Sequence, residues 1–142
     1  MRYAALLGRI LFAAIFIMAA VGHFSQAEID MAAGQGLPFA NFLVPASGLL
    51  ALAGGLSILL GYRARAGAWL LVVFLVPVTL VMHRFWGLSD PAAGQMQQAH
   101  FMKNLSLIGG ALIVSFFGAG PLSIDARVPQ PQAERRHFRR AA

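Results

Sequence analysis

The sequence of 142 residues contains no cysteine and few charged residues, and both absences limit its chemistry. Without cysteine, the chain itself cannot form disulfides, thiolate metal sites, iron–sulfur clusters or thiol redox relays. It also has no phosphate-binding loop, dinucleotide-binding fingerprint or nucleophile elbow. Only 11% of the residues are charged and 58% are hydrophobic, which excludes a soluble globular domain of this length.

Four long apolar stretches fill most of the chain, and Arg9 is the single charged residue within them. They are residues 3–22, 42–62, 66–82 and 105–120. Arg9 lies one or two turns from the start of the first stretch, so its side chain is expected to extend toward water. A helix needs roughly 17–25 residues to cross a hydrocarbon layer of about 30 Å, so the two shorter stretches must include flanking residues. The sequence therefore predicts an all-α integral membrane protein, an antiparallel four-transmembrane-helix bundle over residues 1–125. The helices are expected at about residues 4–24, 41–60, 66–84 and 98–117.

The two connections on one side of this bundle carry almost no positive charge. Residues 25–41 contain none, and a short interfacial helix broken near Gly36 and Pro38 fits their mixed composition. Residues 85–97 are expected to form the second such loop. The other side holds nine arginines: Arg2, Arg9, Arg63, Arg65, Arg127, Arg135, Arg136, Arg139 and Arg140. The positive-inside rule therefore predicts that both termini are cytoplasmic.

The two ends of the chain need separate interpretation. The first apolar stretch resembles a signal peptide, but its removal would leave three spans and contradict the charge pattern, so we expect a retained helix. Residues 126–142 are expected to form a basic, disordered cytoplasmic tail. Because this cluster of arginines follows a membrane helix, it suits anionic lipid head groups better than nucleic acid. Each arginine near the membrane surface contributes ~1 kcal/mol to the attraction. The alternative is that the arginines only fix the topology and have no further role. The lipid-anchoring candidates are Arg135, Arg136, Arg139 and Arg140.

Six polar residues are drawn to the side opposite the arginine-rich one, where the predicted helices end or begin. They are His23, His83, Arg84, His100, Lys103 and Asn104. His100, Lys103 and Asn104 fall within about one helical turn, so their side chains can converge. We expect a shallow polar pocket that receives an anion or the carbonyl oxygens of a quinone, because donors beside a low-dielectric wall bind such oxygens strongly. The alternative is that these residues only meet water and lipid head groups.

The three histidines on that side do not predict a metal site. No pair has the H-x-x-H spacing, and Glu28 and Asp30 lie in a separate loop. No metal or cofactor is therefore evident from the sequence, and a quinone is left as the open alternative. The lipid bilayer is the expected partner.

Several segments resemble the DoxX family of small four-helix bacterial membrane proteins, and in particular its YphA-type members. The resemblance rests on LLGRILFAAIFIMAAVGHF, GGLSILLGYRARAGAWLL, HRFWG, FMKNLSLIGGALIV and GAGPLSID. It implies an inner-membrane protein, with Arg9, His83, Lys103, Asn104 and Asp125 at positions where the family often has those residues. Some members of that family are associated with sulfur-compound oxidation coupled to quinone, and others with membrane-bound redox-stress complexes. The resemblance therefore implies a membrane or soluble redox protein as a partner of this chain.

Two positions depart from the family pattern, which commonly has lysine at His23 and glutamate at Ala51. A proton relay would need that carboxylate within the membrane. The first hypothesis is therefore a non-catalytic membrane partner or a subunit that binds a small molecule or lipid. The alternatives are a quinone-linked oxidoreductase subunit and a small transporter.

Overall fold

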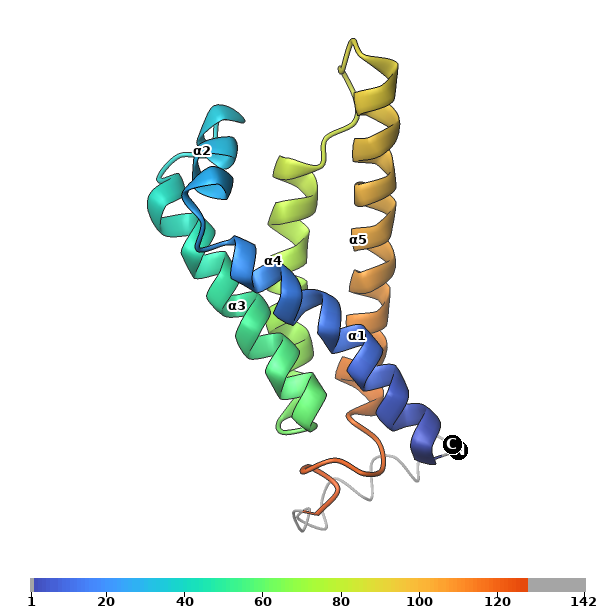
Figure 1. The fold of residues 1–142 in the computed structure, drawn as a ribbon. Coiled ribbons are helices and arrows are strands. Elements are labelled where there is room, and N and C mark those ends of the chain that lie inside the picture. Colours follow the sequence, from blue (N-terminus) through green and yellow to red (C-terminus); the bar gives the residue numbers. More distant parts are fainter. Residues whose placement is uncertain (1, 128–142) are drawn as a thin grey trace.

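The computed structural model describes residues 2–127, and these residues form five α-helices and no β-strand (Figure 1). The helices are α1 (Arg2–Gly22), α2 (Gln26–Gly34), α3 (Ala40–Leu60), α4 (Ala64–Met82) and α5 (Pro91–Phe117). Four of them, α1, α3, α4 and α5, are long and apolar enough to cross a membrane. The predicted all-α fold with four long apolar helices is confirmed. The predicted short helix in the first connection is α2, which ends before Gly36.

Many large apolar side chains lie on the outside of the long helices. Leu11 and Met18 of α1, Val73 of α4, and Ile113 and Phe117 of α5 are each more than half exposed. In water this surface would be unstable, whereas in a bilayer it is the surface that faces lipid. The protein is therefore an integral membrane protein.

The largest error in the expected helix bounds concerns α5, which begins at Pro91 and not near residue 98. The connection from α4 is therefore residues 83–90, and residues 91–97, expected as loop, are helical. Asp90 is the N-cap and accepts hydrogen bonds from the backbone N–H groups of Ala92 and Ala93, while Pro91 occupies the first turn. A capping aspartate followed by proline is a favoured helix start, although the same dipeptide also occurs in turns.

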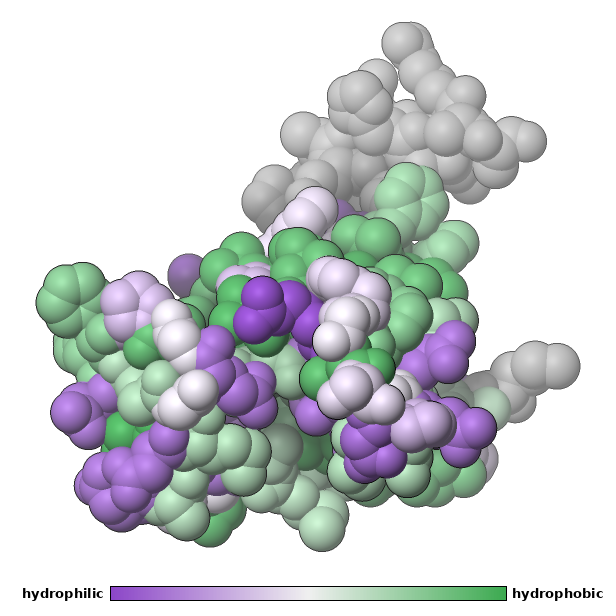
Figure 2. Space-filling model, turned by 90° about the horizontal axis from the view of Figure 1, so that it is seen from above, coloured by the Kyte–Doolittle hydropathy of each residue, from purple (hydrophilic) through white to green (hydrophobic). Residues whose placement is uncertain are grey.

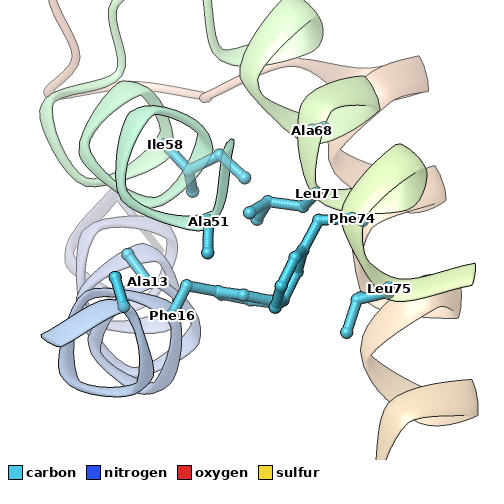
Figure 3. Packing of buried hydrophobic residues seen from close by; sticks show 10 residues of the cluster. Ala13, Phe16, Ala51, Ile58, Ala68, Leu71, Phe74 and Leu75 are labelled. Atoms are coloured by element: carbon cyan, nitrogen blue, oxygen red, sulfur yellow. The ribbon is translucent and has the colours of Figure 1, made fainter. Parts of the chain in front are cut away.

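The core lies between α1, α3 and α4 and consists of a few large side chains among small ones (Figure 3). Phe16 of α1 meets Phe74 of α4 edge-on, with ring centroids 6.5 Å apart, and Leu71 lies beside them. Gly54 of α3 lets the backbones approach, because a Cβ there would be 2.8 Å from the carbonyl oxygen of Gly67. Such close contact drives helix association in lipid, where apolar burial contributes little.

The chain reverses direction at each connection, so the bundle has two distinct ends (Figure 1). One end holds α2 and the 83–90 loop and is called the α2 end. The other holds the tight turn at Gly61 and both limits of the described chain, Arg2 and Arg127, and is called the turn end. α3 packs against α1, α4 and α2, and α4 packs against α5.

Candidate functional site

Two of the predicted site residues meet directly at the α2 end. His83 follows α4, and His100 lies on α5, with their rings stacked at 5.2 Å between centroids and 26° between planes. His83 Nδ1 lies 2.9 Å from Gln97 Oε1. Because an amide oxygen can only accept, Nδ1–H of His83 donates to it, which leaves Nε2 of His83 for a ligand. Both rings are half-buried, so the pair can reach a ligand at the rim.

Gln97 is a site residue that sequence reasoning missed. It was expected in a loop, whereas it lies in the second turn of α5, one turn before His100 on the same face. The spacing Gln97–His100 together with the helix start at Asp90–Pro91 is the pattern that would have found it.

The other candidates on α4 and α5 differ in exposure. Lys103 lies almost one turn beyond His100 and is exposed, as is Arg84, so their positive charges stand at the rim. Asn104, by contrast, is only 4% exposed. The site therefore combines exposed cations, a half-buried imidazole pair and a buried amide. Figure 2 views the molecule from above and shows hydrophilic residues among hydrophobic ones across this face.

His23 has different neighbours. Its ring packs edge-on against Phe74 at 5.6 Å, and its Nδ1 lies 2.9 Å from the carbonyl oxygen of Ala19. The same nitrogen lies 3.6 Å from a carboxylate oxygen of Glu28 on α2. None of these three partners is one of the other five candidates. His23 thus ties α1 to α4 and α2 and does not contribute a ring to the His83–His100 pair.

An aromatic cluster borders that pair. Phe85, Trp86 and Phe101 meet edge-on, with centroid distances of 5.3, 5.4 and 6.0 Å. Phe101 is next to His100 in the chain, and Trp86 is about half exposed. Aromatic rings of this kind favour the boundary between lipid and water. The imidazole pair therefore lies beside rings of the kind that is typical of this boundary.

The turn end contains a polar cluster that the sequence did not predict. Arg9 was expected to extend toward water, and this expectation was wrong: only 6% of Arg9 is exposed. Its Nη1 donates to the carbonyl oxygen of Ala119 at 2.9 Å, and its Nη2 to that of Leu122 at 2.8 Å. The guanidinium stays inside because the segment after α5 folds beneath the bundle and offers these carbonyls.

The same segment is bonded to the turn between α3 and α4. The carboxylate of Asp125 accepts hydrogen bonds from the backbone N–H groups of Arg63 at 2.7 Å and Ala64 at 2.9 Å, where α4 begins. The N–H of Asp125 donates to the carbonyl oxygen of Gly61 at 2.7 Å. Residues 118–127, named the strap here, therefore join α1, α3, α4 and α5.

Within residues 2–127 no group of three or more His, Cys, Asp or Glu side chains is placed to hold a metal ion. The predicted lipid-anchoring residues lie outside the described part of the chain: Arg135, Arg136, Arg139 and Arg140.

These features define a small four-helix membrane protein with a polar rim at one end and a buried arginine at the other. The model of the SURF4 family matches residues 2–129, so the chain belongs to the SURF4 family. It is 32% identical over 120 residues to inner membrane protein YqjF of Escherichia coli, which covers 84% of this chain and 88% of YqjF.

Two other relatives match shorter stretches. Inner membrane protein YphA of Escherichia coli is 30% identical over 70 residues, 49% of each chain. The ER-derived vesicles protein ERV29 of Saccharomyces cerevisiae is 28% identical over 79 residues, which are 56% of this chain and 25% of ERV29. No solved structure matches the chain.

The assignment to the DoxX family was therefore wrong, because the matching family model is that of SURF4. The segments that suggested DoxX consist mainly of apolar helix with small residues at packing positions, a pattern that unrelated membrane bundles share. The redox associations implied by that resemblance lose their basis, and function must be argued from the sites.

Proposed function

We propose that this protein is a non-enzymatic integral protein of the bacterial inner membrane that binds a small molecule or lipid between α4 and α5 at the α2 end. Both termini are cytoplasmic in this proposal, and the α2 end faces outward. The names of YqjF and YphA as inner membrane proteins support the location. The nine arginines assigned to the inner side support the orientation.

The stacked pair of His83 and His100 is the observation that carries the proposal. Two imidazole rings in contact lose part of the hydration that each would have alone. A ligand that forms a hydrogen bond with one ring nitrogen of His83 and one of His100 compensates that loss. The bond to Gln97 fixes the orientation of one ring, and Lys103 supplies a positive charge nearby. Donors fixed in place beside lipid favour a ligand that carries oxygen acceptors.

Co-purification tests the proposal most simply. The protein is extracted in a mild detergent, and native mass spectrometry identifies what remains bound to the wild type and to the double variant His83→Ala/His100→Ala. Gln26→Ala is the control, because Gln26 is an exposed polar residue at the same end on α2. We expect one bound molecule on the wild type and the control, and its loss from the double variant. Equal occupancy of all three proteins would refute the site.

A quinone is the second candidate ligand, because the aromatic cluster beside the imidazoles could pack against a flat ring. Trp86 belongs to that cluster, while Trp69 lies on α4 near its start at the other end of the bundle. In a Trp69→Phe background the remaining tryptophan reports on the site. Saturable quenching of Trp86 fluorescence by a short-chain ubiquinone would support this ligand, and linear quenching without saturation would remove it.

A further inference from the structure

A polar pair lies one turn deeper in the bundle than the imidazoles. α4 and α5 run antiparallel, so the contact of His83 with His100 sets the register, and four residues further in, Thr79 lies level with Asn104. Both are buried, at 3% and 4% exposure. Polar groups at this depth need hydrogen-bond partners, because lipid offers none.

Asn104 lacks such partners within the described part of the chain. The hydroxyl of Thr79 donates to the carbonyl oxygen of Leu75 at 2.6 Å, whereas the amide of Asn104 makes no hydrogen bond to any residue of 2–127. The amide has two donor hydrogens and an acceptor oxygen. Asn104 is 4% exposed, but among residues 2–127 the fully buried side-chain N and O atoms that lack a hydrogen-bond partner comprise only Arg9 Nε, so a group from outside can reach the Asn104 amide and bond it.

The neighbours of α1 change along its length. The first half of α1 touches α5 and the strap: Phe12 lies against Gly110, and Arg9 bonds Ala119. In the second half of α1, Phe16 contacts α4 instead, as does His23 directly after the helix. The two helices therefore diverge toward the α2 end (Figure 1).

Lys103 stands on the side of α5 that faces this divergence. It lies seven residues, or about two helical turns, before Gly110, so both occupy the same face of the helix that meets α1 lower down. Leu107 lies between them on that face and is half-buried. A molecule between α1 and α5 would meet, in order of depth, a cation, a buried amide on the adjoining face and an apolar surface.

We propose that the surface of α5 from His100, beside α4, to Lys103, which faces α1, holds an anionic phospholipid from the leaflet at the α2 end; this deepens and rests on the function proposed above, with which it shares His100. Lys103 and the half-buried His100 bind the phosphate. The amide of Asn104 donates to an ester carbonyl, and an acyl chain packs beside Leu107 and Phe12. The order of charge, carbonyl and hydrocarbon along a phospholipid matches the order of these residues, which a soluble anion would not need.

Lipid retention tests the inference. Wild type, Asn104→Leu, Lys103→Gln and Ser106→Ala are reconstituted in vesicles of phosphatidylcholine and phosphatidylglycerol and extracted in mild detergent, and native mass spectrometry counts the lipids that remain. Ser106 is the control, since it is exposed and its hydroxyl bonds the carbonyl oxygen of Met102. We expect wild type and control to retain phosphatidylglycerol. Asn104→Leu should lower its retention about tenfold, the effect of one charged or buried hydrogen bond.

Lys103→Gln should remove the preference for phosphatidylglycerol over phosphatidylcholine. Because Lys103 is exposed, we expect Lys103→Gln to fold even if Asn104→Leu fails to fold. Circular dichroism checks the folding of both variants. Retention of phosphatidylglycerol by Lys103→Gln at the level of Ser106→Ala would overturn the inference. Displacement of the lipid by inorganic phosphate would also overturn it, because the site would then hold a soluble anion. If either result is obtained and the His83→Ala/His100→Ala variant still loses a bound molecule other than phosphatidylglycerol, the lipid inference fails but the proposed function stands.

Discussion

The buried guanidinium of Arg9 gives the sharpest prediction about stability. Arg9→Met replaces arginine with an unbranched apolar side chain and removes both hydrogen bonds to the strap. These bonds are 2.9 Å long to the carbonyl oxygen of Ala119 and 2.8 Å long to that of Leu122. The carbonyl oxygen of Ala119 then loses its donor at a buried position, and that of Leu122 loses its donor at a partly buried one. The strap should detach from α1, while α1 keeps its packing against α3.

The expected magnitude follows from two scales. A hydrogen bond from a charged group contributes about 1.5–3 kcal/mol in water-soluble proteins, and polar contacts between membrane helices average about 0.6 kcal/mol. Arg9 Nε has no partner among the described residues, and relief of that buried group offsets part of the loss. For two bonds we expect Arg9→Met to lower the free energy of unfolding by about 2–4 kcal/mol.

Reversible unfolding in mixed micelles, titrated with sodium dodecyl sulfate and followed by circular dichroism, measures this change. Arg2→Met is the matched control, because Arg2 is an exposed arginine of the same helix. Identical unfolding midpoints for Arg9→Met and Arg2→Met would refute the assignment of Arg9 as the residue that holds the strap.

Two further predictions use the same assay. Asp125→Ala removes the carboxylate that accepts hydrogen bonds from two backbone N–H groups at the start of α4. It should lower the free energy of unfolding by about 1–2 kcal/mol, as the loss of a helix cap does. A decrease no larger than that caused by Arg127→Ala, at an exposed position of the strap, would contradict this prediction. Gly54→Ala places a Cβ 2.8 Å from a carbonyl oxygen of α4 and should destabilise the bundle, whereas Gly109→Ala meets nothing within 4 Å and should be neutral or slightly stabilising. Equal effects at the two glycines would show that close packing of α3 on α4 is not what Gly54 provides.

The long helices were predictable because length and hydropathy act locally. Apolar runs set the four long helices, and their observed bounds lie within two residues of the expected ones except at the start of α5. That start was missed because Asp90-Pro91 with Gly94 fits a turn as well as a helix cap. The local pattern allowed both structures, and only the cap bonds to Ala92 and Ala93 distinguish them.

The candidate site was predictable only in part, because its geometry depends on how helices dock. Topology placed six polar residues at one end, and two of them, His83 and His100, do meet. The different surroundings of His23 come from its packing on Phe74, which no sequence pattern specifies. Arg9 was misjudged for the same reason: its partners at Ala119 and Leu122 lie more than a hundred residues away, and an arginine near a helix end usually reaches water.

The orientation of the bundle decides whether the imidazole rim faces outward, and site-directed labelling measures it. The natural chain has no cysteine, so single cysteines at the exposed positions Ser89 and Tyr62 each report one end of the bundle. In intact cells, a membrane-impermeant maleimide is predicted to modify Ser89→Cys and to leave Tyr62→Cys unmodified until the cells are lysed. Labelling of Tyr62→Cys but not of Ser89→Cys in intact cells would contradict the account.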